Sequence, residues 1–170
     1  MGTTASTSLL ALLRRELCMH PPFAQMAEAD VDFFLAQAQA QYFAPGETLI
    51  APASGVVQQL FYVRQGVVSG RREVAGQPSS AFAYEAGSLI PLSAAVGERA
   101  VTATYRADAD TFVLIIPVTA MRELATRSPV FAVFLSQRIA HFLELSRQAL
   151  QASYAAQALT EYSLERPLSE

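Results

Sequence analysis

Residues 87–107 are the part of this chain whose residue types and spacing point most directly to chemistry. Their sequence is GSLIPLSAAVGERAVTATYRA, in which an apolar strand leads into small residues, a glycine turn with Arg99, and a Thr-Ala-Thr-Tyr strand. Backbone N–H groups that such a turn leaves unpaired are donors for an anion. The segment therefore predicts a pocket that holds a phosphate on main-chain N–H groups.

Two side chains of this segment, Arg99 and Thr102, are candidates for direct contact with the anion. A guanidinium forms charge-assisted hydrogen bonds, and a threonine hydroxyl adds a neutral donor. For each of these residues a purely structural role stays open as the alternative. Arg99 would be a solvated turn residue beside Glu98, and Thr102 would be an ordinary strand residue. We expect Arg106 to face outward from its strand.

Other catalytic and metal-binding chemistries lack the residues that they need. The two histidines, His20 and His141, fall outside the predicted strands, so a cupin-like site of two histidines and a carboxylate cannot be assembled. Asp108 and Asp110 lie close together, but aspartates in a tight turn are typical turn residues. The sequence has no Gly-x-Ser-x-Gly elbow, no phosphate-binding loop with lysine and no Cys-x-x-Cys pair. We expect no catalytic residue, no metal, no cofactor and no enzyme activity.

Short β-branched or aromatic runs alternate with turn signals in the middle of the chain. The signals recur roughly every 8–12 residues, which is typical of an all-β sandwich or barrel. No long helix separates the runs, which argues against a doubly wound α/β fold. We place the roll at residues 41–118. The candidate strands are residues 48–51, 60–64, 67–72, 80–84, 102–107 and 112–116.

Helical patterns flank the strands. Leucines at helical spacing end at His20-Pro21-Pro22, which places a helical N-terminal segment at residues 1–40. Residues 119–160 are predicted to be helical, and Ser128-Pro129 begins a long helix there with serine as its cap. Small residues late in this helix favour a homodimer, and the alternative is a helix packed on its own domain. Residues 161–170 have the composition of a linker toward a further module.

The bulk composition is that of an intracellular globular domain. The 170 residues are 52% hydrophobic and 16% charged. The net charge of -3 lacks the excess of positive charge that is typical of nucleic-acid-binding proteins. The single cysteine, Cys18, fits a reducing cytoplasm and is predicted to be buried. No apolar run reaches the roughly 20 residues of a membrane span. We expect a cytoplasmic protein with no nucleic-acid or membrane partner.

Three motifs in this order resemble the cyclic nucleotide-binding domain family. They are FAPGETLI at 43–50, LFYVRQGVV at 60–68 and the segment 87–107, which we call the cassette. A narrower resemblance, through HPPF at 20–23, AVTATY at 100–105 followed by DTF at 110–112, and SPVF at 128–131, is to the N-terminal module of certain bacterial signal-transduction proteins. In those proteins CBS domains and a nucleotidyltransferase-like module follow, so the resemblance implies downstream modules of these kinds as partners.

The resemblance also implies roles for residues of the cassette. In the family, a Gly-Glu pair begins a short helix whose N–H groups hold the cyclic phosphate, and the glutamate accepts a hydrogen bond from the ribose. An arginine, then Ser or Thr, then Ala, contacts the phosphate. Here the Gly-Glu pair falls on Ile90 and Pro91, the arginine on Val101 and the hydroxyl residue on Thr102. Both charged contacts are thus absent from their usual positions.

Other features of the cassette are compatible with a ligand. Pro91 suits the first position of a helix, so the N–H donors can persist. Arg99 precedes the expected arginine position by two residues, about 6–7 Å along an extended chain, and its long side chain can recover part of that distance. The expected ligand-binding residues are Ile90, Pro91, Leu92, Ser93, Ala94, Arg99, Val101, Thr102 and Ala103.

We therefore expect a mainly β fold with flanking helices, namely a double-stranded β-helix (a jelly-roll-like β-roll) with N-terminal helices and a long C-terminal helix. The expected function is a non-enzymatic regulatory sensor. It would bind cAMP, cGMP or another nucleotide or related anion in a degenerate cassette, and would relay binding to attached modules through the C-terminal helix. The alternative is a dimerisation and docking scaffold that has lost nucleotide binding.

Overall fold

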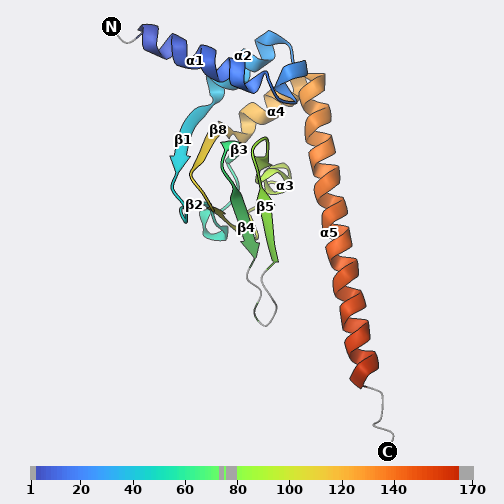
Figure 1. Ribbon diagram of the computed structural model, residues 1–170. Helices are drawn as coiled ribbons and strands as arrows, with labels where there is room; N and C mark the ends of the chain where they lie inside the picture. Colours follow the sequence, from blue (N-terminus) through green and yellow to red (C-terminus); the bar gives the residue numbers. More distant parts are fainter. Residues whose placement is uncertain (1–2, 73–74, 76–79, 165–170) are drawn as a thin grey trace, which may run out of the picture. The chain divides into compact units, whose positions relative to one another are not determined.

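The computed structural model describes residues 3–72, 75 and 80–164 (Figure 1). The chain divides into two compact units, residues 1–134 and residues 135–170. The helical elements are α1 (Thr3–Leu17), η1 (Phe23–Gln25), α2 (Glu28–Gln37), η2 (Pro52–Ser54), α3 (Leu92–Val96), α4 (Val118–Arg127) and α5 (Pro129–Leu164). The strands are β1 (Gln39–Phe43), β2 (Thr48–Ile50), β3 (Gln59–Gln65), β4 (Val68–Arg72), β5 (Ser80–Tyr84), β6 (Leu89–Ile90), β7 (Thr104–Ala107) and β8 (Thr111–Pro117).

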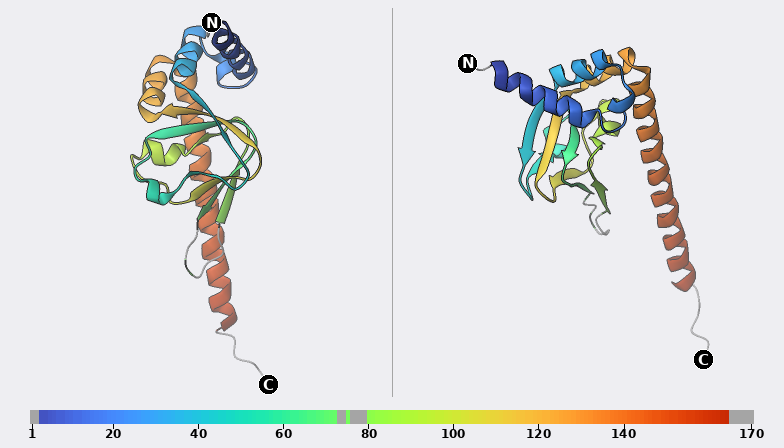
Figure 2. Two further views of the ribbon diagram at one scale, coloured as in Figure 1. Left: turned by 90° about the vertical axis from the view of Figure 1, so that its left-hand side faces the viewer. Right: turned by 45° about the horizontal axis from the view of Figure 1, so that its top comes forward.

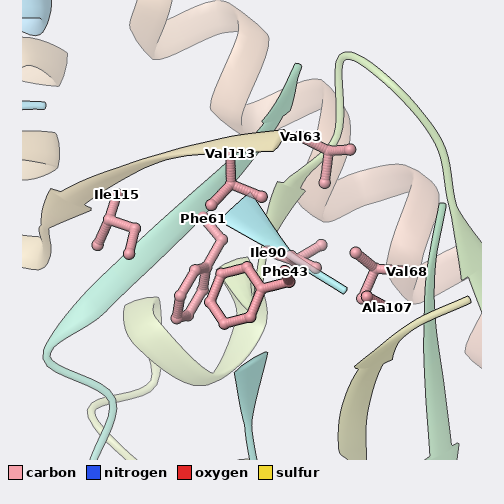
Figure 3. Close-up of a cluster of buried hydrophobic side chains, with 8 residues drawn as sticks. All are labelled: Phe43, Phe61, Val63, Val68, Ile90, Ala107, Val113 and Ile115. Carbon is pink, nitrogen blue, oxygen red and sulfur yellow. The ribbon is translucent and has the colours of Figure 1, made fainter. Parts of the chain in front are cut away.

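The strands of the first unit form two antiparallel sheets, with orders β1-β8-β3-β6 and β2-β7-β4-β5. Figure 2 shows how the strands of both sheets curve round one interior. Apolar side chains from both sheets meet there in one buried cluster (Figure 3). The cluster consists of Phe43, Phe61, Val63, Val68, Ile90, Ala107, Val113 and Ile115. β3 and β8 each supply alternate residues to it, because side chains of a strand point to opposite faces.

The other face of the β3 sheet is covered by the N-terminal helices. Tyr62, between the core residues Phe61 and Val63, packs edge-on against Phe23, with ring centroids 5.3 Å apart. The ring centroid of Phe34 in α2 lies 4.8 Å from that of Phe23. Apolar cover on both faces explains why the run Leu60–Val63 is continuously apolar instead of alternating. Burial of this run therefore holds the roll and α2 together.

Two ion-pair groups attach α1 within this unit. The guanidinium of Arg64 in β3 contacts both carboxylate oxygens of Glu16, at 2.6 and 3.2 Å. Arg14 lies 3.2 Å from Glu28 and 3.5 Å from Asp32 of α2. The contact of Arg64 is the stronger of these ion pairs because it has two parallel hydrogen bonds and is partly buried.

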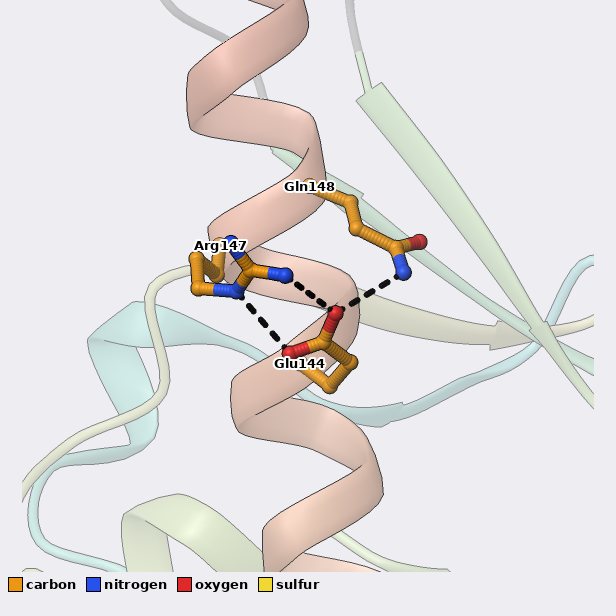
Figure 4. Close-up of polar contacts among 3 residues, drawn as sticks. All are labelled: Glu144, Arg147 and Gln148. Carbon is orange, nitrogen blue, oxygen red and sulfur yellow. Dashed lines mark hydrogen bonds and ion pairs between the residues drawn. The ribbon is translucent and has the colours of Figure 1, made fainter.

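Helix α5 begins at the predicted cap, since the Oγ of the buried Ser128 accepts a hydrogen bond from the amide of Phe131 at 3.2 Å. Along the second unit, Glu144 accepts hydrogen bonds from Arg147 and Gln148 of the next turn (Figure 4). Leu143, Leu150 and Tyr154 of this helix are exposed. In the part of the chain that the structure describes, no helix combines the length and apolarity that crossing a membrane requires.

The structure confirms the predicted fold class and the six predicted strands, with ends shifted by up to two residues. Two strands, β1 and β6, were missing from the list of candidate strands, although the start of residues 87–107 was interpreted as an apolar strand. β1 is an edge strand with mostly exposed residues, and β6 has only two residues, so neither carries a clear apolar alternation. The prediction that Cys18 is buried was wrong: α1 ends at Leu17, and Cys18 lies exposed in the turn that follows. Of the linker predicted at 161–170, residues 161–164 are helical and belong to α5, and residues 165–170 lie outside the described residues.

Candidate functional site

The cassette runs from β6 through the short helix α3 to β7, on the first unit. The first hydrogen bond of α3 runs from the amide of Ala95 to the carbonyl of Pro91, at 3.1 Å. The amides of the preceding turn, at Leu92, Ser93 and Ala94, consequently have no acceptor within the helix. The sequence analysis assigned a phosphate to these amides, and that role stays a prediction.

Arg99 folds back over this helix. Its guanidinium donates to the Oγ of Ser93 at 3.4 Å and to the carbonyl of Ala100 at 3.3 Å. The backbone around it is also tied down, because the amide of Arg99 donates to the carbonyl of Ala94 and its carbonyl accepts from Val57. Arg99 therefore has a fixed backbone and a weakly held, exposed side chain that can turn toward an anion.

A second arginine reaches the cassette from β4. The Nη2 of Arg72 donates to the Oγ1 of Thr102 at 2.6 Å. This arginine was not among the predicted site residues. The alternation of side chains along β4 could have identified it. Val68, Gly70 and Arg72 fall on one face of this strand, and Val68 belongs to the core cluster, so Arg72 is on the inner face. The inner face of β4 thus supplies a cation beside the cassette.

Two tyrosines lie between these arginines and the core. Tyr84 and Tyr105 have ring centroids 5.7 Å apart, and both rings cover Gly70, where a Cβ would approach them to 3.3–3.4 Å. Burial raises the pKa of Tyr84, and the neighbouring Tyr105 adds to the rise. Burial also raises the pKa of Tyr105, although Arg99 and Arg72 act in the opposite direction. Both phenols are therefore neutral at physiological pH.

The structure places the predicted site residues in two groups. Ser93, Arg99, Thr102 and Ala103 retain some exposure, and the first two are in hydrogen-bond contact. The other five are buried, and Ile90 belongs to the core cluster. These buried residues are Ile90, Pro91, Leu92, Ala94 and Val101. Any contact that they make with a ligand would come from the backbone, and their binding role stays a prediction.

The cassette is also linked to α4. Glu98, the residue before Arg99, has a positive φ of 50°, which is unusual for a residue with a side chain. Its carboxylate lies 2.8 Å from the guanidinium of Arg122 in α4. The turn that positions Arg99 is thus held from one side by a helix that leads directly into α5.

Comparison with known proteins gives a clear result at the level of fold. No family model matches the chain, and no curated protein was found to match its sequence. Solved structures match well. The Thermus thermophilus catabolite activator protein is 23% identical with a TM-score of 0.64, over 75% of this chain and 60% of that one. The chain has the fold of cyclic nucleotide-binding domains.

Two further structures share this cyclic nucleotide-binding fold. The regulatory domain of Toxoplasma gondii PKA, solved with cAMP, is 16% identical with a TM-score of 0.68, over 81% of this chain and 52% of that one. The sensor domain of the Pseudomonas aeruginosa regulator DNR is 12% identical with a TM-score of 0.62, over 75% of this chain and 91% of that one. The chain thus spans between half and two thirds of the length of the first two structures. At these identities the comparison establishes the fold alone.

Proposed function

We propose that this chain is a non-enzymatic regulatory sensor domain that binds a nucleotide or a related phosphate-bearing ligand at the cassette. The observation that carries the proposal is the convergence of Arg99 and Arg72 on hydroxyl groups of the cassette, Ser93 and Thr102. The fold shared with the regulatory domain of Toxoplasma gondii PKA, which was solved with cAMP, supports the same proposal.

The proposed contacts follow from the chemistry of these groups. The phosphate accepts from the free amides of the first turn of α3 and from the hydroxyl of Thr102. Arg99 and Arg72 supply the positive charge that Val101 lacks. Absence of the usual glutamate and arginine removes two charge-assisted bonds, each worth roughly 1.5–3 kcal/mol. Binding of cAMP is then weaker than in a complete cassette by about 10²–10⁴-fold.

Signal transfer in this proposal runs through the turn beside Arg99. A ligand that draws Arg99 toward its phosphate also moves Glu98, whose carboxylate is bonded to Arg122. Helix α4 contains Arg122 and leads into α5. If α4 has two arrangements, the ligand would shift the equilibrium between them, and α5 would transmit the change to an attached module. Downstream CBS and nucleotidyltransferase-like modules are the partners proposed for this output, in the cytoplasm.

Helix α5 is the proposed homodimer interface. Leu143, Leu150 and Tyr154 are 61%, 60% and 70% exposed, and they recur at steps of seven and four residues on the helix. Exposed apolar residues at such spacing suit pairing with a second helix. Sedimentation of the wild-type chain and of Leu143→Glu tests this directly. Dimers that dissociate in the variant are expected, and a monomeric wild type at high concentration contradicts the interface.

The second candidate function is a docking scaffold that binds no small molecule. Two observations favour it: Tyr84 and Tyr105 occupy the interior above Gly70, and Pro91 and Val101 are buried apolar residues at the positions of the family's glutamate and arginine. In this alternative the cassette is a structural loop, and α5 alone carries the function.

Isothermal titration with cAMP, cGMP, AMP and cyclic dinucleotides separates the two candidates. The sensor predicts saturable heat with at least one compound, and predicts that Arg99→Gln and Thr102→Val reduce it. Arg15→Gln is the matched control, since it removes one exposed arginine of α1 that is not part of the cassette. Heat that is equal in all four proteins, or absent across the series, contradicts the sensor and favours the scaffold.

A further inference from the structure

A hollow lies on the outer face of the β2-β7-β4-β5 sheet. It has a volume of about 600 Å³ and is lined by Gly46, Pro52, Ser69, Arg71, Thr102, Thr104, Arg106, Ala107 and Asp108. Ser69 and Arg71 alternate along β4 with Val68 and Gly70, whose positions face the interior. The hollow, which we call the outer groove, is therefore on the opposite side of this sheet from the tyrosines of the cassette.

Two unpaired guanidiniums belong to the outer groove. In the strand register Ser69 lies opposite Arg106 and Arg71 lies opposite Thr104, so the two arginines are diagonal neighbours. The Cβ atoms of such neighbours are about 7–8 Å apart. Within the described residues neither the guanidinium of Arg71 nor that of Arg106 forms a hydrogen bond or an ion pair. Two like charges on one wall of a hollow repel each other, and an anion between them removes that repulsion.

The groove also offers both acceptors and donors of hydrogen bonds. Asp108 accepts from the hydroxyl of Ser69 through Oδ1 at 2.8 Å, so Oδ2 is left to accept from a ligand. Thr104 also lines the groove, and its hydroxyl can donate to a ligand. No aromatic ring is among the lining residues, so the groove provides no surface on which a base could stack.

We propose that the outer groove is a second binding site, for a small phosphate ester that carries hydroxyl groups, such as a sugar phosphate. The phosphate lies between Arg71 and Arg106, which can each form two parallel hydrogen bonds with it. A sugar hydroxyl donates to Asp108, and Thr104 completes the contacts. The volume suits such a molecule, since small-molecule sites commonly have about 300–1,000 Å³. Thr102 lines the groove and also belongs to the cassette, but the charged contacts proposed here, Arg71 and Arg106, differ from those of the cassette, Arg99 and Arg72.

Titration of the full chain with ribose 5-phosphate, inorganic phosphate and ribose tests the proposal. Nuclear magnetic resonance follows the side-chain Nε–Hε signals of Arg71 and Arg106, and calorimetry gives the affinity. We expect both signals to shift saturably with ribose 5-phosphate. We expect weaker binding of inorganic phosphate and no binding of ribose.

Variants locate the site. Arg71→Gln and Arg106→Gln should each weaken ribose 5-phosphate binding about 10- to 100-fold, because each removes a charge-assisted contact. Arg15→Gln, which removes an exposed arginine of α1, should leave the affinity unchanged. The proposal is overturned if Arg71→Gln and Arg106→Gln bind as Arg15→Gln does, or if the signals of Arg71 and Arg106 do not move. Equal affinity for phosphate and its sugar ester overturns the assignment to a hydroxylated ligand.

This experiment distinguishes failure of the groove proposal from failure of the cassette proposal. Arg99→Gln disables the cassette in the proposal above, yet it leaves the outer groove intact, so it should bind ribose 5-phosphate with wild-type affinity. A cassette that binds no nucleotide therefore does not affect the outcome for the groove. Loss of ribose 5-phosphate binding in Arg99→Gln would contradict a separate site.

Discussion

Replacement of Arg72 by glutamine is the sharpest perturbation of the proposed cassette site. The side chain stays long and polar, but it loses its charge and the 2.6 Å bond that fixes the hydroxyl of Thr102. A charge-assisted hydrogen bond contributes roughly 1.5–3 kcal/mol, which corresponds to about a 10- to 100-fold change in affinity. Because Arg72 is exposed, solvent screening places the expected loss near the lower end of that range.

The assay is calorimetric titration of the wild type, Arg72→Gln and the control Arg15→Gln with the tightest nucleotide of the series. We expect about tenfold weaker binding for Arg72→Gln, a smaller difference at high salt, and unchanged binding for Arg15→Gln. Thermal unfolding without ligand should be nearly unchanged, because surface substitutions away from special features usually alter stability by at most ~0.5 kcal/mol. Equal affinities of Arg72→Gln and Arg15→Gln refute the assignment of Arg72 to the site.

Three further predictions concern stability. Gly66→Ala should lower the free energy of unfolding by about 2–4 kcal/mol, because its Cβ would lie 2.5 Å from the carbonyl oxygen of Asp110 at a positive φ. Gly46→Ala, with a similar φ and open space, should lose only about 1–2 kcal/mol in the same urea titration, and equal losses would contradict the steric argument. Ser128→Ala removes the cap of α5 and should cost about 1 kcal/mol; an unchanged urea midpoint would exclude that role. The raised pKa of Tyr84 means that the folded state holds this proton after the unfolded chain has lost it, so stability should fall as pH rises above about 10. Tyr84→Phe should reduce that fall in alkaline denaturation curves, and an identical pH dependence would show that Tyr84 does not cause it.

Much of the fold could be predicted from the sequence because its signals are local. The apolar run of β3, the turn glycines and the Ser128-Pro129 cap each act over a few residues, and each lies where the sequence placed it. β1 could not be found in this way, since four of its five residues are exposed and only its pairing with β8 makes it a strand. Cys18 was misplaced because its burial depended on where α1 ends.

The candidate site was less predictable because it is assembled by strand register. Arg99 and Ser93 are close in sequence and meet in the structure. Arg72 reaches Thr102 across 30 residues, and the Tyr84–Tyr105 pair depends on β4 lying between β5 and β7. Periodicity within one segment carries no information on such pairings. The resemblance located the cassette in the chain, but it did not supply the second arginine.

The central claim is that the cassette receives a phosphate, and a ¹H–¹⁵N nuclear magnetic resonance titration with cyclic nucleotides tests it most directly. The account predicts saturable shifts at the amides of Leu92, Ser93 and Ala94 and at the side chains of Arg99 and Arg72, with smaller changes in α4. Saturable shifts confined to other parts of the chain, or none at all at millimolar ligand, would contradict it.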